Sequence, residues 1–290
     1  MRKMIGSIDV LTPGLLTSIQ DKGRFGFKRF GVPVSGTMDH QSAAMANHLL
    51  NNDASAAVME ITLTGPQLVF NSDTLIVITG ADLSPAVNGG ACFMNRPVQL
   101  SAGDLLSFGG ARKGVRAYLS VKGGFQTEKV MNSFSYYSGI TSNALIKKGD
   151  RLSIHSSRSS GQLKSVVKED PTLFDSLELP CTAGPEFEIL KQEDQKSLFD
   201  LEFSVGGDNN RMGYRLNENN LSYPESYSML TSSVLPGTVQ LTPSGQLIVL
   251  MRDCQTTGGY PRILQLSETA INRLSQKRTQ DRVQFAIRNL

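Results

Sequence analysis

The feature that most constrains the fold is an internal repeat: the second half of the chain resembles the first at low similarity. The stretch 65–78 resembles the stretch 237–250, at an offset of 172 residues. Slowly drifting offsets are expected when a duplicated domain acquires loop insertions, and the period is far longer than the roughly 20–50 residues of a solenoid repeat. We therefore predict two tandem copies of one domain, with a binding site at their joint. The anchors of the repeat pair Gly14 with Gly184, Met38 with Met212, Gly65 with Gly237, Leu100-Ser101 with Leu274-Ser275, and Phe108 with Phe285.

Length and charge exclude several classes of protein. The 290 residues are enough for two domains that each bury a core. The formal net charge of +3 is too small, and the basic residues too dispersed, to indicate a nucleic-acid partner. The three cysteines lie far apart, which favours a reducing compartment. The amino terminus lacks the apolar run of a signal peptide, and no apolar stretch approaches the roughly 20 residues of a membrane span. We expect a cytoplasmic protein with no membrane and no nucleic-acid contacts.

Short β-branched and aromatic runs separated by turn residues dominate the chain. The runs 67–70, 75–78 and 117–121 have the length and composition of strands. Asn71–Asp73 and Pro243–Gly245 occupy matching places in the two halves, and both are typical of hairpin turns. Short, evenly punctuated strands indicate a mainly β fold, a barrel or a sandwich, rather than a parallel α/β sheet.

Two helices interrupt this β pattern. The first begins after Asp39 as N-cap, continues through Leu50 and ends at Asn51-Asn52. The second covers 192–201. The stretch 156–170 is rich in Ser, Lys and Gly without periodicity, which is typical of a linker. We predict two domains, residues 1–158 and 168–290.

Several familiar types of active site are missing from the sequence. No phosphate-binding loop occurs, and the segment 109–114 has the wrong spacing for one. His40 and His48 lie two helical turns apart, too far to share a metal ion without other ligands. No cysteine has a histidine nearby, and no nucleophile elbow appears. We therefore expect no metal site and no nucleophile–histidine chemistry.

Polar residues instead gather in three turn-rich segments. In 20–39, glycines around Arg24 allow close backbone approach to a ligand, but a tight hairpin with an Asp21–Arg24 surface pair explains the pattern equally well. In 206–215, Gly and Asn residues can form an anion-binding nest, to which Arg211 and Arg215 add charge; a solvated turn is the alternative. The third segment, 253–262, follows a strand and favours a ligand-binding loop. Glu60 is a candidate buried carboxylate.

These same segments resemble the allophanate hydrolase subunit 2 family, across essentially the whole chain. The N-terminal signature comprises 17–24, 31–39 and 60–63, and the C-terminal signature comprises 211–216, 236–237 and 255–261. The family includes the C subunit of 5-oxoprolinase, part of the carboxyltransferase region of urea carboxylase, and an antagonist of a sporulation-kinase inhibitor. Its members resemble two tandem cyclophilin-like β-barrel domains with few short helices. The chain departs from the family pattern at Cys254, where an Arg is common, and around 131–137, where the family tends to have a Gly-Ser element. Because of the second departure, the resemblance assigns no catalytic role to Ser133 or Ser135.

The resemblance also implies a set of site residues. Arg211 and Arg24 are expected to bind a carboxylate or phosphate, because guanidinium groups pair with both in a bidentate manner. A carboxylate among the catalytic residues is expected to act as general base. The implied catalytic residues are Asp21, Asp39, Glu60 and Arg211. The implied substrate-binding residues are Arg24, Ser35, Gly36, Met38, Met212, Tyr214, Gln255, Thr256, Thr257 and Tyr260.

The function that the resemblance implies is that of the C subunit of an ATP-dependent 5-oxoprolinase, which opens 5-oxo-L-proline to L-glutamate. ATP is expected to be shared with partner subunits, and no metal or biotin is expected on this chain. The implied partners are a companion of the allophanate hydrolase subunit 1 family, a third 5-oxoprolinase subunit and a small-molecule substrate. Two alternatives stay open: a carboxyltransferase-like component acting on urea or allophanate-type amides, and a non-catalytic regulator that binds a kinase inhibitor.

Overall fold

The chain forms two compact units in a computed structural model. The first unit contains the chain up to Arg24 and Ser35–Asp170, and the second contains Phe25–Val34 and Pro171–Leu290. The second unit is therefore discontinuous in sequence. Much of the expected linker at 156–170 lies outside the residues that the structure describes. The described residues are 5–157, 166–168, 170–218, 221–224 and 227–288.

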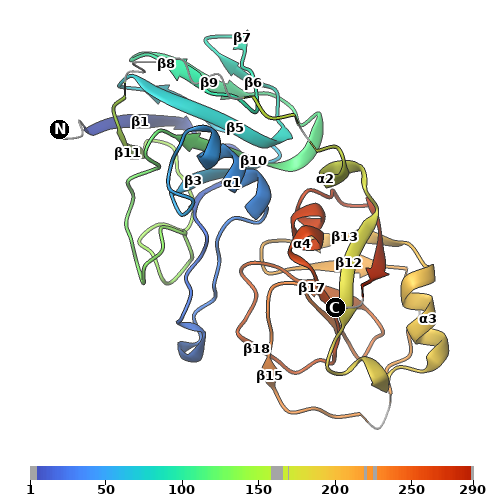
Figure 1. Ribbon diagram of the computed structural model, residues 1–290. Coiled ribbons are helices and arrows are strands. Elements are labelled where there is room, and N and C mark those ends of the chain that lie inside the picture. Colours follow the sequence, from blue (N-terminus) through green and yellow to red (C-terminus); the bar gives the residue numbers. More distant parts are fainter. Residues whose placement is uncertain (1–4, 158–165, 169, 219–220, 225–226, 289–290) are drawn as a thin grey trace. The chain divides into compact units, whose positions relative to one another are not determined.

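Two antiparallel sheets build the first unit, which Figure 1 colours from blue to green. One sheet has the strand order β11-β1-β4-β9-β6-β7, and the other has the order β2-β3-β10-β5-β8. The strands are β1 Ile5–Thr12, β2 Leu16–Gln20, β3 Val58–Thr62, β4 Gln67–Phe70, β5 Thr74–Asp82, β6 Pro85–Val87, β7 Gly90–Ala91, β8 Val98–Leu100, β9 Leu105–Phe108, β10 Lys113–Val121 and β11 Arg151–His155.

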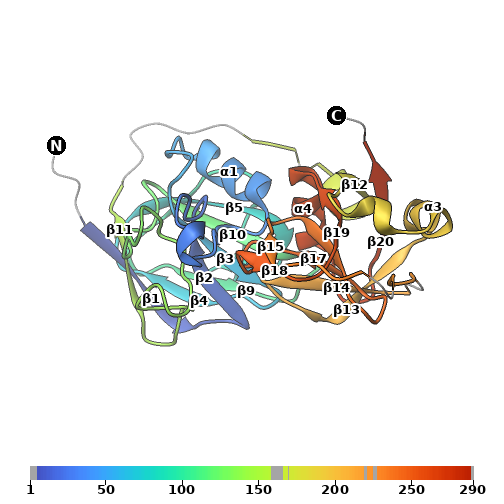
Figure 2. The same cartoon turned by 90° about the horizontal axis from the view of Figure 1, so that it is seen from below.

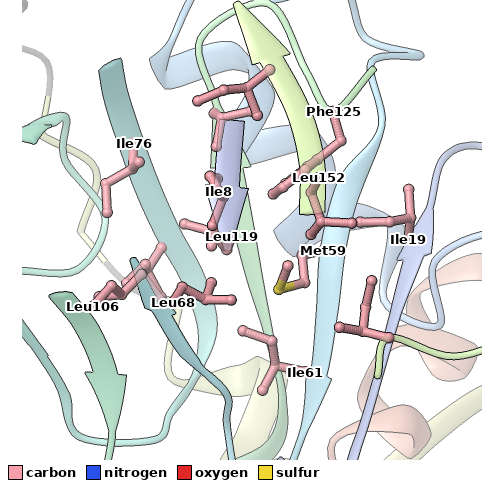
Figure 3. Packing of buried hydrophobic residues seen from close by; sticks show 14 of the residues in the cluster. Ile8, Ile19, Met59, Ile61, Leu68, Ile76, Leu106, Leu119, Phe125 and Leu152 are labelled. Carbon is pink, nitrogen blue, oxygen red and sulfur yellow. The ribbon is translucent and has the colours of Figure 1, made fainter. Parts of the chain in front are cut away.

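The hydrophobic core of the first unit is shared by the two sheets (Figure 3). Ile8 of β1 and Leu68 of β4 come from the first sheet, and Met59 of β3 and Leu119 of β10 come from the second. All four side chains are buried. Alternation along each strand directs these apolar residues to one face, so the two sheets bury a common interior.

Helix α1, His40–Leu49, covers the outer face of the second sheet. Ala46 and Leu49 pack against Leu75 and Val77 of β5. The carboxylate of Asp39 accepts a hydrogen bond from the backbone N of Ser42 at 3.0 Å, which caps the first turn. The helix predicted from the Asp39 cap is confirmed, and its apolar positions face the sheet as expected.

A closed barrel forms the second unit, which Figure 1 colours mainly from yellow to red. Its strand order is β12-β19-β16-β17-β14-β13-β20, and parallel pairing between β12 and β20 closes it. A separate pair, β15 and β18, lies outside this order. The strands are β12 Glu178–Ala183, β13 Phe203–Asn209, β14 Gly213–Asn217, β15 Ser232–Ser233, β16 Thr238–Leu241, β17 Leu247–Leu250, β18 Thr257–Gly258, β19 Arg262–Leu266 and β20 Arg282–Ile287.

Short helices pack around this barrel, and Figure 2 shows α4 beside β12 and β19. The helix expected at 192–201 is confirmed as α3, which contacts β20. Lys277, which follows α4, donates a hydrogen bond from Nζ to the backbone oxygen of Phe174 in α2 at 2.7 Å. The helices are α2 Thr172–Asp175, α3 Gln192–Asp200 and α4 Glu268–Ser275, with 3-10 turns η1 Lys28–Phe30 and η2 Phe187–Ile189.

Of the details predicted from the repeat, one is confirmed and two are wrong. Pro243–Gly245 joins the two strands of a hairpin as predicted, because β16 pairs with β17. Asn71–Asp73 does not, because β4 and β5 belong to different sheets, so the chain turns a corner between sheets at this point. The anchor that matches Leu100 to Leu274 also fails, since Leu100 ends strand β8 and Leu274 lies in helix α4.

The fold class expected from the sequence is confirmed: the chain is mainly β, with a barrel and few short helices. The superposition of the two units as copies of one domain stays a prediction. Within the described part of the chain, none of the helices has the length and apolar character needed to cross a bilayer.

Candidate functional site

The carboxylate of Asp21, just after β2, is surrounded by donors. Its Oδ1 atom accepts hydrogen bonds from the backbone N of Gly23 at 2.8 Å and from the hydroxyls of Ser133 and Ser135, each at 2.7 Å. Its Oδ2 atom accepts from the backbone N of Phe134 at 2.7 Å. An ionised carboxylate has about four lone-pair sites. Asp21 therefore connects the 133–135 loop to the end of β2 as a hydrogen-bond acceptor, and Ser133 and Ser135 are two of its donors.

Arg24 is fully buried beside this cluster. Its Nε donates to the backbone oxygen of Val130 at 3.1 Å, and its Nη2 donates to the backbone oxygen of Ser135 at 2.6 Å. Met131 and Asn132, at the tip of the loop that Arg24 holds, have positive φ angles of 50° and 64°. Of the two interpretations of this segment, the hairpin with an Asp21–Arg24 surface pair is wrong, because both side chains are buried and bind the same loop.

Glu60 of β3 is the buried carboxylate that the sequence suggests. Its Oε2 accepts hydrogen bonds from the backbone N of Met38 at 2.7 Å and from the hydroxyl of Tyr118 at 2.9 Å. Arg116 Nε lies 3.9 Å from Oε1. Burial of Tyr118, together with the charges of Glu60 and Asp39, raises the pKa of its phenol well above the usual value. Tyr118 therefore stays protonated and donates to Glu60.

Asp39 joins this second cluster through its backbone and caps α1 with its side chain. Its backbone N donates to the hydroxyl of Tyr118 at 2.8 Å, and its carboxylate accepts from the hydroxyl of Ser42 at 2.6 Å. The carboxylate is fully buried at the start of the helix, where negative charge is favourable. Asp39 thus has a structural role in starting α1.

The loop that carries Ser35 and Gly36 runs close to the segment after Asp21. A Cβ atom on Gly36 would lie 3.0 Å from the backbone N of Gly23, and its φ of 93° also favours glycine. Ser35 is fully buried with a φ of 57°, and its hydroxyl has no hydrogen-bond partner among the described residues. Such a conformation is costly and requires support from its surroundings.

All the site residues predicted for the first unit are therefore buried, and the structure brings them together into two adjoining networks. The backbone N of Thr37 donates to the backbone oxygen of Asp21 at 2.9 Å and so connects the networks. Their catalytic and substrate-binding roles stay predictions. The residues concerned are Asp21, Arg24, Ser35, Gly36, Met38, Asp39 and Glu60.

A pocket of about 250 Å³ lies on the outer face of the barrel in the second unit. Its floor comes from three neighbouring strands, β14, β17 and β16. Side chains alternate along each strand, so Tyr214 and Val249 point into the barrel while Arg215 and Ile248 point outward. The lining residues are Asn210, Met212, Gly213, Arg215, Gln240, Ile248, Leu250, Gln255 and Tyr260.

The two loops beside the pocket are joined by backbone hydrogen bonds. The backbone N of Met251 donates to the oxygen of Met212 at 2.9 Å, and that of Asp253 donates to the oxygen of Arg211 at 2.8 Å. The guanidinium of Arg211 forms a bidentate pair with the carboxylate of Asp253, at 2.7 and 2.9 Å. Arg211 is therefore bound by an internal carboxylate and does not line the pocket.

Three other residues predicted from the C-terminal signature, Met212, Gln255 and Tyr260, do line the pocket. Tyr214 is fully buried inside the barrel. Thr256 and Thr257 do not line the pocket; their backbones connect the loop after β17 to β15. The backbone oxygen of Thr256 accepts a hydrogen bond from the backbone N of Val234, and Thr257 of β18 pairs with Ser233 of β15.

The sequence prediction missed Gln240, included Asn210 only as part of the nest expected in 206–215, and named Arg215 only as added charge. Gln240 lies in the middle of β16, where nothing in a single sequence separates it from any other strand residue. Only the strand register places its side chain in the pocket. Arg215 could have been found, because it alternates with the apolar residues 214 and 216, a pattern typical of a half-buried strand.

The pocket has a simple electrostatic character. Arg215 is the one charged side chain among the lining residues, and Asn210, Gln240 and Gln255 contribute amides. The lining therefore suits a small polar ligand with a negative charge. No cluster of three or more His, Cys, Asp or Glu side chains that could hold a metal ion occurs among the described residues.

The chain matches the model of one protein family, described as carboxyltransferase domain, subdomain A and B, over residues 30–287. It is 33% identical over 273 residues to the C subunit of 5-oxoprolinase from Escherichia coli, covering 93% of this chain and 87% of that protein. It is 32% identical over 283 residues to the C subunit of 5-oxoprolinase from Haemophilus influenzae, covering 96% of this chain and 90% of that protein.

A solved structure, that of the K. lactis urea amidolyase, has the same fold. The match has a TM-score of 0.85 at 28% sequence identity and covers 96% of this chain, but only 18% of that chain. The protein therefore spans less than a fifth of the urea amidolyase. The resemblance found from the signature residues is confirmed over nearly the whole length. The chain belongs to the carboxyltransferase domain family, subdomains A and B, together with the C subunits of the two bacterial 5-oxoprolinases.

Proposed function

We propose that this chain is the C subunit of an ATP-dependent 5-oxoprolinase. The observation that carries the proposal is the match over most of both chains with two proteins of that name, at 33% and 32% identity. The match with the urea amidolyase, in contrast, covers a small part of a much longer protein. The substrate is 5-oxo-L-proline, and the product is L-glutamate.

The chemistry of this reaction fits the pocket of the second unit. Water adds to the lactam carbonyl, the C–N bond breaks, and the nitrogen takes up a proton to become the amine of glutamate. The substrate is a small amide with one negative charge, and the lining offers three amide side chains and one guanidinium. These groups bind and orient the lactam, and a developing oxyanion needs hydrogen-bond donors of this kind.

The pocket lacks a group that could act as general base, because its lining residues include no carboxylate and no histidine. Asp21, Asp39 and Glu60 belong to the first unit, where donors of the protein itself engage each carboxylate. We therefore propose that partner subunits supply the rest of the active site and that this chain alone is inactive. The companion of the allophanate hydrolase subunit 1 family and a third subunit are the partners.

ATP does not fit this pocket by charge. A triphosphate carries several negative charges, whereas the lining contains a single cation. In this proposal the partner subunits hold most of the nucleotide, and no step of the reaction is assigned to ATP on this chain.

A second candidate function is a carboxyltransferase component that acts on urea-type amides. The family model and the structural similarity to a urea amidolyase favour it. The amides of Asn210, Gln240 and Gln255 also match the donors and acceptors of a ureido group, such as that of biotin carried by another polypeptide. In this alternative urea itself is neutral, and the carboxylate that Arg215 could bind is that of carboxybiotin or of the allophanate product.

The test is a reconstitution with the two partner subunits. Glutamate release from 5-oxo-L-proline is measured for each subunit alone, for each pair and for the full set, with and without ATP. We expect turnover only in the full set with ATP. Turnover by this chain alone contradicts the need for partners. A full set that is inactive on 5-oxo-L-proline but transfers the carboxyl group of a carboxybiotinylated carrier to urea, which releases allophanate and the biotinylated carrier, supports the second candidate.

A further inference from the structure

We propose that Gln240 and Arg215 form a two-point recognition site for a small amide that also carries a carboxylate. Gln240 binds the amide N–H, Arg215 binds the carboxylate, and Gly258 positions the side chain of Gln240. The identification of the ligand as 5-oxo-L-proline rests on the proposed function, but the chemical class does not.

Strand register places the two side chains in one row. Arg215 of β14 pairs with Ile248 of β17, and Ile248 pairs in turn with Gln240 of β16. All three residues line the pocket. Two strand spacings of about 4.8 Å separate the first and third Cα atoms by roughly 10 Å. A long arginine side chain can reach across this span, so one small ligand can contact both ends while its ring lies on Ile248.

Gln240 is a buried amide whose hydrogen-bonding capacity is only partly used. The residue is 2% exposed, and it lines the pocket. Nε2 donates to the backbone oxygen of Tyr260 at 3.1 Å, whereas Oε1 accepts no hydrogen bond from the described residues. Oε1 therefore has acceptor capacity that an N–H of a ligand in the pocket can use.

Gly258 explains why this amide stays in place. A Cβ atom on Gly258 would lie 2.7 Å from Gln240 Nε2 and 3.3 Å from Cγ1 of Val234. Any larger residue would displace the amide from its contact with the oxygen of Tyr260. β18, which carries Gly258, is fixed by its pairing with β15. Gly258 is therefore a positioning residue that acts through Gln240.

Arg215 differs from Arg211 in the use of its guanidinium. The fork of Arg211 is filled by Asp253. The only hydrogen bond of the Arg215 side chain to the described residues is a 3.5 Å contact from Nη1 to the oxygen of Asp208. No acidic side chain is among the residues that line the pocket beside it. Its planar fork is thus available to a ligand carboxylate, which it can bind in a bidentate manner.

This arrangement predicts selection by charge. A neutral amide such as urea or 2-pyrrolidinone can use Gln240 but gives Arg215 nothing to bind. A carboxylate without an amide can use Arg215 but leaves Gln240 unsatisfied. An acidic amide uses both, so the site favours 5-oxo-L-proline over each partial ligand.

The experiment measures binding of 5-oxo-L-proline and of 2-pyrrolidinone, the same lactam without the carboxylate, to the purified full chain by calorimetry. Arg215→Gln is expected to raise the Kd of 5-oxo-L-proline about 10- to 100-fold and to leave the Kd of 2-pyrrolidinone unchanged. Gln240→Met and Gly258→Ala are expected to weaken the binding of both ligands. Arg112→Gln, which removes an exposed arginine of the first unit, is the matched control. Thermal melting of each variant verifies folding.

The outcomes separate this inference from the proposed function. Equal weakening of both ligands by Arg215→Gln, or no binding by the wild-type chain and the assembled complex, overturns the inference. A full complex assembled with the Arg215→Gln chain could also turn over 5-oxo-L-proline with the wild-type KM. That result overturns the inference and leaves the proposed function intact. Charge-selective binding without turnover by the full set supports the inference and contradicts the proposed function.

Discussion

Asp21, just after β2 in the first unit, and Arg215, within β14 of the second, are both charged residues, yet their surroundings are opposite. Asp21 is buried, and its carboxylate accepts four hydrogen bonds from its own chain. Arg215 is exposed and makes one long hydrogen bond to the described residues. The first residue holds loops together, and the second has capacity left for a ligand.

The same contrast separates two arginines that lie four positions apart. Arg211 fills its fork with Asp253, and both side chains are nearly buried, with 11% and 12% exposure. A charge next to a pocket is thus no evidence of ligand binding until its internal partners are known. The difference teaches that unused hydrogen-bonding capacity identifies a binding residue better than charge or position does.

The largest change in stability is expected for a substitution of Asp21, and it tests whether this carboxylate has the structural role that distinguishes it from Arg215. Asp21→Ala removes one acceptor from four donors in a buried loop, so the free energy of unfolding should fall by about 3 kcal/mol or more. Urea unfolding followed by circular dichroism measures this change. Asp200→Ala, at an exposed position at the end of α3, is the control and should change stability by about 0.5 kcal/mol or less. Similar small effects at the two positions would show that the network around Asp21 is not structural.

A medium effect is expected for the pair Arg211–Asp253. A double-mutant cycle with Arg211→Ala and Asp253→Ala should give a coupling energy of about 1–3 kcal/mol in unfolding, because the pair is bidentate and mostly buried. Arg215→Gln should leave the free energy of unfolding within about 0.5 kcal/mol of the wild type. A destabilising Arg215→Gln with no coupling in the cycle would reverse the roles assigned to the two arginines.

The smallest effect is expected on the pH dependence of stability, through a second internally paired arginine of the second unit, Arg262. Hydrogen bonds from the Arg262 side chain lower the pKa of Glu186 below its ordinary value of 4.5. A carboxylate with a depressed pKa contributes stability above its unfolded-state pKa and loses that contribution as the pH falls through the folded-state value. We expect thermal stability between about pH 7 and about pH 3 to fall less steeply in Glu186→Gln than in the wild type. Identical slopes would mean that this pair contributes nothing to acid sensitivity.

The sequence alone predicts those elements whose signals are local. The Asp39 cap and the apolar spacing that follows specify α1, and the hairpin at Pro243–Gly245 follows from its turn residues. The similar turn at Asn71–Asp73 instead joins two sheets, which no local signal reveals, because strand pairing is decided by distant residues. Helix α4 is missed since the repeat matches its Leu274 to a strand, although Ser267 is a good N-cap.

The candidate site is predictable only in part, for the same physical reason. The C-terminal signature identifies Gln255, Tyr260 and Met212, which line the pocket. Gln240 depends on the register of three strands, and the difference between Arg211 and Arg215 depends on where Asp253 lies. Neither can be obtained from residue type and spacing in one sequence.

The discontinuous second unit has a consequence for synthesis of the chain on the ribosome. Phe25–Val34 is made early but belongs to the unit that is completed last. Lys28 donates from Nζ to the backbone oxygen of Val234, 206 positions further along. At about 5–20 residues per second, the nascent segment waits roughly 10–40 seconds for this partner to emerge. During that interval the Lys28 side chain lacks its Val234 acceptor, so slow translation leaves the segment 25–34 without this contact for longer than fast translation does.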